Sequence, residues 1–140
     1  MNTNMLKYNK INIILVLLFI TNILSAQIIH QPEPISGNNL AHKMIEQHMK
    51  YPQNALDNKL GGKIDVLFTI EKNGNATGHR VENVFDDECA AEAIHLVKLI
   101  QWKPATKDAL PIEYEYKFTV EFSPKTYLKN IKNKKVKFIP

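Results

Sequence analysis

The chain has 140 residues, of which 44% are apolar and 23% are charged. This length fits one small domain with tails and excludes a barrel or a doubly wound enzyme of about 200 residues or more. A single cysteine, Cys89, excludes an intramolecular disulfide and a cysteine metal cluster. The charge is segregated, because residues 123–140 hold six Lys and no acid, whereas residues 27–122 hold ten basic and 14 acidic residues. The net charge of +4 is therefore no sign by itself of nucleic acid binding.

The first 26 residues have the pattern of an export signal. A basic, acid-free stretch precedes an apolar core over residues 11–24, and the small pair Ser25-Ala26 follows it. A helix needs about 20 apolar residues to span a bilayer, and this core is shorter. We therefore expect a signal peptide over residues 1–26, cleaved between Ala26 and Gln27, and export to the periplasm. The alternative is an uncleaved inner-membrane anchor.

Two helices are predicted before the first long strand. Residues 27–37 show no periodicity and are expected to form an extended lead-in. From Asn38, a good N-cap residue, apolar side chains recur at helical spacing. They are Leu40, Met44, Ile45 and Met49. Tyr51-Pro52 is expected to end this helix, and a second short helix over 52–58 is expected to end at Gly61-Gly62.

A β-hairpin is predicted next. Residues 63–71 alternate apolar and polar side chains, which is typical of a strand with one buried face. Asn73-Gly74 follows and is a strong hairpin signal, because both central residues of the favoured two-residue turn need positive φ. The return strand, about 75–85, is weaker because Gly78 interrupts it.

A helix and a long strand complete the predicted domain. Asp86-Asp87-Glu88 places carboxylates at the start of a helix over about 87–100, where they complement its dipole. The predicted apolar stripe of this helix is Cys89, Ala93, Ile94, Val97 and Ile100. Residues 112–122 then alternate strictly for eleven residues. The element order predicts an α+β domain: a three-stranded antiparallel sheet with helices packed on one face.

No constellation of catalytic or metal-binding residues is evident. Cys89 and His95 fall on different sides of one helix, and Cys89 is expected to be a small buried residue. His42 and Glu46 are one helical turn apart, but no third ligand lies nearby, so a solvated helix face is the better interpretation. We therefore predict no enzymatic activity, no cofactor and no metal. Trp102 and Tyr51 are expected to be buried structural residues.

Several motifs occur in the order and spacing of a known family. They are Tyr51-Pro52 with Ala55, the hairpin at Asn73-Gly74, the helix around Glu92-Ala93, Trp102-Lys103-Pro104, and the alternating strand after Pro111. Together, over residues 51–122, they resemble the C-terminal domain of the TonB family. With the preceding helix, the resemblance implies a TonB C-terminal-like domain over residues 38–122.

The resemblance also implies a function in TonB-dependent transport. TonB proteins contact a short segment, the TonB box, of an outer-membrane transporter, which adds as a strand to the last strand of the domain. Strand addition suits a long, regular edge strand. The outward residues of 112–122 would then influence specificity, while the backbone supplies the affinity. They are Glu113, Glu115, Lys117, Thr119 and Glu121. Equally, these residues could form only a solvated face, with the edge pairing with a second copy as a homodimer.

The chain departs from the pattern of a full energy transducer. Only residues 27–50 separate the N-terminal segment from Tyr51, a reach of at most about 80 Å, and the long Pro-rich spacer of transducers is missing. A soluble periplasmic binding module is therefore favoured over a short anchored transducer coupled to an inner-membrane motor complex, and over a self-associating structural protein. The Lys-rich tail, 123–140, is expected to be mobile, or to contain a short strand through Val136 and Phe138.

Overall fold

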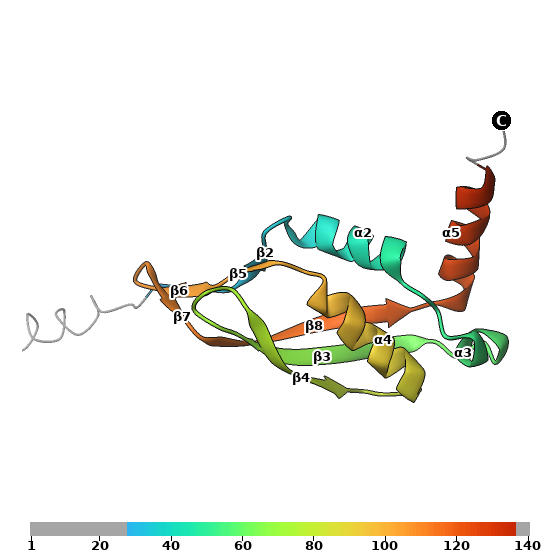
Figure 1. Cartoon of the computed structure of the whole chain (residues 1–140), viewed down its shortest axis with the longest axis horizontal. Helices are drawn as coiled ribbons and strands as arrows, with labels where there is room; N and C mark the ends of the chain where they lie inside the picture. Colours follow the sequence, from blue (N-terminus) through green and yellow to red (C-terminus); the bar gives the residue numbers. More distant parts are fainter. Residues whose placement is uncertain (1–27, 137–140) are drawn as a thin grey trace, which may run out of the picture.

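The structure, a computed structural model, describes residues 28–136 (Figure 1). The predicted cleavage site at Ala26 and Gln27 lies outside these residues. The elements in chain order are β1 (Ile29–His30), β2 (Glu33–Pro34), α2 (Asn38–His48), α3 (Gln53–Asp57), β3 (Gly62–Ile70), β4 (Ala76–Glu82), α4 (Asp87–Lys98), β5 (Trp102–Lys103), β6 (Ala105–Lys107), β7 (Leu110–Ile112), β8 (Tyr114–Phe122) and α5 (Pro124–Val136).

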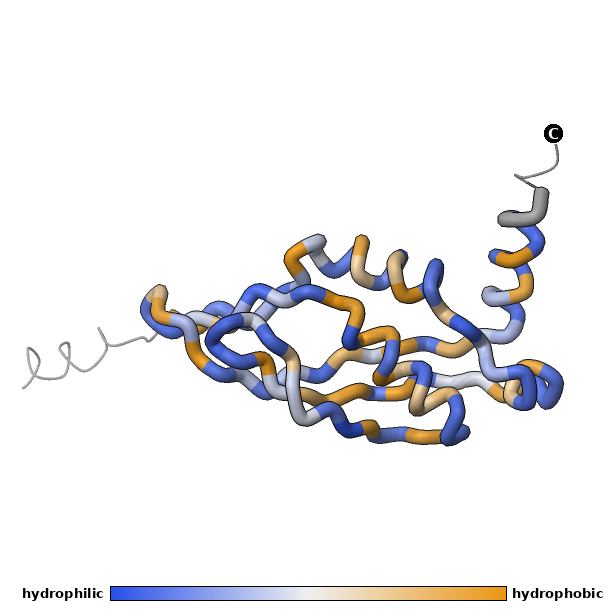
Figure 2. The backbone as a smooth tube through the Cα atoms, viewed as in Figure 1, coloured by the Kyte–Doolittle hydropathy of each residue, from blue (hydrophilic) through white to orange (hydrophobic). Residues whose placement is uncertain are grey.

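The main sheet is antiparallel and has three strands in the order β4-β3-β8. On β3 the four apolar side chains that alternate along the strand are fully buried, and Phe118, Val120 and Phe122 of β8 join them. Figure 2 shows the corresponding alternation of hydrophobic and hydrophilic residues along both strands. The α+β architecture and the three-stranded antiparallel sheet predicted from the sequence are confirmed.

Helix α4 covers the buried face of the sheet. The carboxylate of Asp86 caps its N-terminus by accepting a hydrogen bond from the Cys89 backbone N–H at 2.8 Å. The buried residues of α4 are Cys89, Ala90, Ala93, Leu96 and Val97. The predicted stripe was thus nearly correct, except that Leu96 is buried and Ile94 only half-buried.

Helix α2 buries most of its predicted apolar stripe, because Ile45 is buried and Met44 and Met49 pack against the core. Its buried residues are Ala41 and Ile45, whereas Leu40 is 58% exposed. Its N-cap is Gly37 without a side-chain hydrogen bond, so the predicted cap at Asn38 is wrong. The one difference in the stripe is that the small Ala41, and not Leu40, faces the core.

The β3–β4 hairpin turns differently from the predicted two-residue turn. Gly74 has φ +87°, but Asn73 does not have positive φ. Instead, the Gly74 N–H donates to the Glu71 carbonyl at 2.9 Å, and the Asn73 side chain accepts from the Asn75 N–H at 2.8 Å. An added Cβ on Gly74 would lie 2.6 Å from the Trp102 carbonyl oxygen, so both the conformation and the space require glycine.

Gly61-Gly62 does not end α3, contrary to the prediction. The helix ends at Asp57, and Asn58 is its C-cap. Gly61 instead allows the chain just before β3 to lie close to the end of β8, because a Cβ there would lie 2.7 Å from the Phe122 carbonyl oxygen. This glycine therefore fixes how closely the entry to β3 approaches the end of β8.

Short strands extend the fold beyond the main sheet. The segment expected to form an extended lead-in contains two short strands, β1, which pairs with β6, and β2, which pairs with β5. The predicted strand 112–122 is divided, because β7 turns back onto β6 and only β8 joins the main sheet. These pairings gather β1, β6 and β7 at the opposite end of the molecule from α5 (Figure 1).

The Lys-rich segment begins as a helix, so the expectation of a mobile tail or a short strand there is wrong through Val136. The Ser123 hydroxyl accepts from the Thr126 N–H at 3.3 Å, and Pro124 occupies the first turn. A Ser followed by Pro is a helix-start signal. It was overlooked because the segment was interpreted from its high lysine content. Helix α5 thus directly follows β8 and projects from the domain (Figure 1).

Candidate protein-interaction edge

Strand β8 lies at one edge of the main sheet. All nine of its residues are in register with β3, from Tyr114 opposite Ile70 to Phe122 opposite Gly62. Within residues 28–136 no strand pairs with its other side. An edge strand carries a row of N–H and C=O groups without strand partners, which another extended chain can satisfy. This side of β8 is called the β8 edge below.

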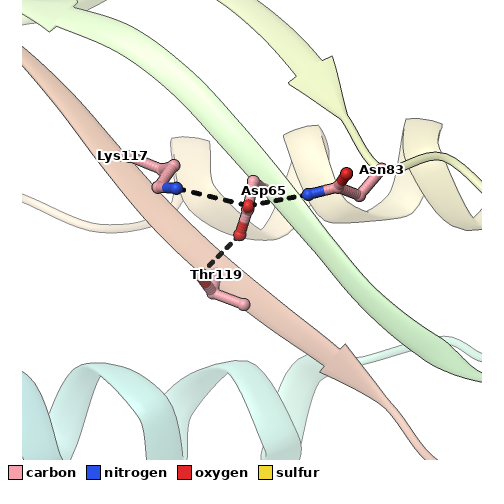
Figure 3. A network of polar contacts seen from close by, with 4 residues as sticks. All are labelled: Asp65, Asn83, Lys117 and Thr119. Atoms are coloured by element: carbon pink, nitrogen blue, oxygen red, sulfur yellow. Dashed lines mark hydrogen bonds and ion pairs between the residues drawn. The ribbon is translucent and has the colours of Figure 1, made fainter.

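The predicted outward residues of β8 face the solvent side of the sheet, and two of them hold a carboxylate of β3 (Figure 3). Thr119 Oγ1 donates to Asp65 Oδ1 at 2.6 Å, and Lys117 Nζ lies 3.5 Å from Asp65 Oδ2. Asn83 Nδ2 donates to the same Oδ2 at 3.0 Å. The side chain of Asp65 is only 13% exposed. Thr119 and Lys117 are therefore engaged in fixing β8 to β3.

The three predicted glutamates differ in their surroundings. Glu115 forms an ion pair with Arg80 of β4, which spans the solvent face of the sheet. Glu113 is exposed in the gap between β7 and β8. Glu121 is exposed near the end of β8 and lines two hollows beside the β8 edge. The structure thus brings Glu121, but not Glu115, to the edge where a partner would bind.

A groove separates the end of β8 from helix α2. It has a volume of about 310 Å³ and contains Thr119, Val120 and Glu121 of β8. Its other lining residues are His42, Ile45 and Glu46 of α2 and Lys63 of β3. The His42 ring stacks on Phe118 with ring centroids 4.7 Å apart, which holds α2 alongside the strand. We name this hollow the β8–α2 groove.

A second hollow continues the β8–α2 groove toward α5. It has a volume of about 210 Å³ and shares Glu46 and Glu121 with the groove. Ser123, Thr126, Tyr127 and Asn130 close its far side. Sequence reasoning placed His42 and Glu46 on a solvated helix face and missed this groove, because the packing of α2 beside β8 leaves no local sequence signal.

Buried aromatic side chains pack against one another beneath the β8 edge. Trp102 is 4% exposed, and its ring lies 5.0 Å from Tyr116 and 5.2 Å from Phe68 between centroids. Tyr51 is 6% exposed, donates its hydroxyl to the Leu60 carbonyl, and packs edge-on against Phe122. Burial raises the pKa of the Tyr51 hydroxyl to about 12. The predicted burial of both residues is confirmed.

The described residues offer little for catalysis. Cys89 is fully buried, as predicted, and burial raises the pKa of its thiol to about 12, so it is not a thiolate nucleophile at neutral pH. Within residues 28–136, no three His, Cys, Asp or Glu side chains are grouped so that they could hold a metal ion. Among the helices of the same residues, none is both long and apolar enough to cross a membrane.

Comparison with known proteins identifies the domain. The family model for the C-terminal domain of Gram-negative bacterial TonB proteins matches residues 47–124, more than half of the chain. The chain belongs to the TonB C-terminal family. No match was found among curated proteins.

Membership of the TonB C-terminal family shows a TonB-type module of TonB-dependent transport. The family is a non-enzymatic protein-interaction family whose domains are periplasmic and contact outer-membrane transporters. The matched region begins near the end of α2 and ends at the start of α5, so it includes all of β8. The α2 residues that line the β8–α2 groove, His42, Ile45 and Glu46, precede the matched region.

Proposed function

We propose that this chain is a periplasmic TonB-type module that binds a short extended segment of an outer-membrane transporter, the TonB box, by strand addition at the β8 edge. The observation that carries the proposal is the position of β8. It is a nine-residue strand held to β3 along its whole length, and within the described chain no strand covers its other side. Main-chain hydrogen bonds to the added segment then supply most of the affinity.

The side chains beside the β8 edge are proposed to select the segment. Alternate side chains of an added strand point to opposite faces of the sheet. Those on the helix side point toward α2 and meet Ile45 and Glu46 in the β8–α2 groove. Those on the solvent side pass Glu115, Lys117 and Thr119, which are already paired within the domain, so we assign these three a smaller effect on affinity.

Site-specific photo-crosslinking tests where the partner binds. A photoreactive amino acid replaces Glu121 on β8 in one variant and Glu82 on β4, the opposite edge of the same sheet, in a matched control; both residues are exposed. With solubilised outer membrane, we expect a crosslink to a transporter from position 121 and none from position 82. Equal crosslinking from both positions, or crosslinking at 121 only to a second copy of the chain, would contradict the proposal.

We also propose that the module is released into the periplasm by cleavage between Ala26 and Gln27. The support is the apolar core over residues 11–24 followed by Ser25-Ala26. The mass of the chain recovered from the periplasm is expected to correspond to a start at Gln27. An intact chain starting at Met1 in the inner-membrane fraction would support a short anchored transducer instead.

A further inference from the structure

Three lysines of α5 lie on one side of the helix. Lys125, Lys129 and Lys132 follow one another at spacings of four and three residues, so they align along the helix axis. All three side chains are exposed. We call them the α5 lysine stripe.

The α5 lysine stripe faces away from the rest of the domain. The opposite side of the helix is the packed one, because Thr126, Tyr127 and Asn130 line the hollow beside β8. The Tyr127 ring also lies 5.2 Å from the Tyr51 ring between centroids. At about 100° per residue, these positions lie on the far side of the helix from the stripe. The stripe is thus directed outward, not into the β8–α2 groove.

The charge of the α5 lysine stripe is not neutralised within the described chain. Helix α5 contains no acidic residue, and none of its three stripe lysines forms an ion pair within residues 28–136. By contrast, Lys103 and Lys117 on the body of the domain do form ion pairs with carboxylates. The sequence adds further lysines immediately after the stripe. This end of the molecule therefore presents a concentrated positive charge to an external partner.

We propose that the α5 lysine stripe binds the surface of an anionic phospholipid bilayer. Leu128, 53% exposed, lies next to Lys125 one turn along the helix and can enter the headgroup region. The main attraction is electrostatic, because clustered lysines on an exposed helix are drawn to anionic lipid headgroups. A nucleic acid surface is a poorer fit, because the only arginine of the chain, Arg80, pairs with Glu115 on the sheet.

This binding is independent of the proposed strand addition. The stripe faces away from the second hollow, which lies between α5 and the β8–α2 groove, so a bilayer and a transporter segment can be bound at once. The bilayer would then hold the module near a membrane while the β8 edge stays accessible. Loss of one interaction is not expected to abolish the other.

A fluorescence experiment tests the proposal on the full chain. Leu128→Cys is labelled with an environment-sensitive fluorophore; Cys89 is fully buried and does not compete for the label. Where residues 1–26 are retained, the chain is held in nanodiscs of neutral lipid; phosphatidylglycerol vesicles are then added. We expect increased emission that 0.5 M salt suppresses, and no increase with neutral vesicles. The same label at Lys72→Cys, in the β3–β4 turn, is expected not to respond.

Charge variants provide the matched control. Replacing the three stripe lysines by Gln is expected to raise the vesicle concentration for half-maximal response roughly 100-fold. Replacing Lys43, Lys50 and Lys59, which are also exposed, by Gln is expected to change this vesicle concentration less than about twofold. Circular dichroism checks that both triple variants fold. The proposal is overturned if the stripe variant responds like the unmodified chain, if neutral vesicles work equally well, or if soluble polyglutamate at the same charge concentration gives an equal response.

Discussion

Asp65 shows how one side chain fixes the edge strand from the solvent side of the sheet. It receives hydrogen bonds from Thr119 on β8 and Asn83 after β4, with Lys117 beside it. The Thr119 hydroxyl lowers the pKa of the Asp65 carboxyl below its ordinary value, and Lys117 and Asn83 act in the same direction. The charged carboxylate is therefore preferred in the folded protein, and it ties the three strands of the sheet together.

The lowered pKa predicts a pH-dependent contribution to stability. Because Asp65 has a lower pKa folded than unfolded, its contribution is present above the unfolded value near 3.8 and is lost as the pH falls through the folded value. Asp65→Asn is expected to cost about 1–3 kcal/mol at pH 7. The difference in melting temperature from the unmodified protein is expected to be constant between pH 7 and 5 and to shrink below pH 4. A difference that stays constant down to pH 2 would exclude this role.

The titration of His79 does not affect the comparison between Asp65→Asn and the unmodified protein. Burial lowers the pKa of the His79 imidazole, and Lys98 acts in the same direction. The unfolded chain therefore takes up a proton first, and both proteins lose stability as the pH falls below about 6.5. Because His79 is present in both proteins, its contribution cancels in the difference of melting temperatures.

Two glycines of the β3–β4 hairpin, Gly74 in the turn and Gly78 within β4, are expected to respond differently to substitution by alanine. Gly74 and Gly78 both have positive φ, but only Gly74 lies against another segment, with the Trp102 carbonyl oxygen 2.6 Å from an added Cβ. Gly78→Ala is expected to cost about 1–2 kcal/mol of unfolding free energy from backbone strain alone. Gly74→Ala adds a steric clash worth about 1–3 kcal/mol. Urea titration measures the loss of unfolding free energy in each variant. Equal losses would show that the turn can move away from the Trp102 carbonyl oxygen without cost.

The sequence predicted the elements that have a strong period and missed those defined by contacts. Strand β3 and helix α4 were predicted because their buried faces repeat every two and every three to four residues. Strands β1 and β2 have two residues each, too few for any period, and exist only because β6 and β5 lie beside them. Helix α5 was missed because its lysines dominate the composition, although Ser123-Pro124 marked its start.

The candidate site was also predictable only in part. Its strand was predicted from strict alternation, and its position at the sheet edge follows from the order β4-β3-β8. Which side chains accompany the edge was not predictable, because that depends on how α2 packs beside β8. Glu46 comes to lie near Glu121 in the groove only through this packing, since the two residues are 75 positions apart.

At the scale of the whole molecule, the fold presents two separate surfaces around β8. The β8 edge and its groove lie between α2 and the sheet, and the α5 lysine stripe points outward from the far side of the following helix. Because α5 begins two residues after β8 ends, a partner on either surface is positioned relative to the other. The central claim concerns the first surface: binding uses the main chain of β8.

Proline substitution at two neighbouring positions of β8 tests this claim most directly. Successive N–H groups of a strand point to opposite sides, so of residues 119 and 120 one N–H points to β3 and the other to the β8 edge. Proline removes the N–H and fixes φ. Thr119→Val is the matched control, because it removes the hydroxyl bonded to Asp65 but keeps the N–H.

Of Thr119→Pro and Val120→Pro, we expect one to unfold the domain and the other to remain folded but lose the transporter in a pull-down from solubilised outer membrane, with folding checked by circular dichroism. Thr119→Val is expected to retain binding. If the folded proline variant binds the transporter as well as the unmodified chain, strand addition at β8 is not how this domain binds its partner.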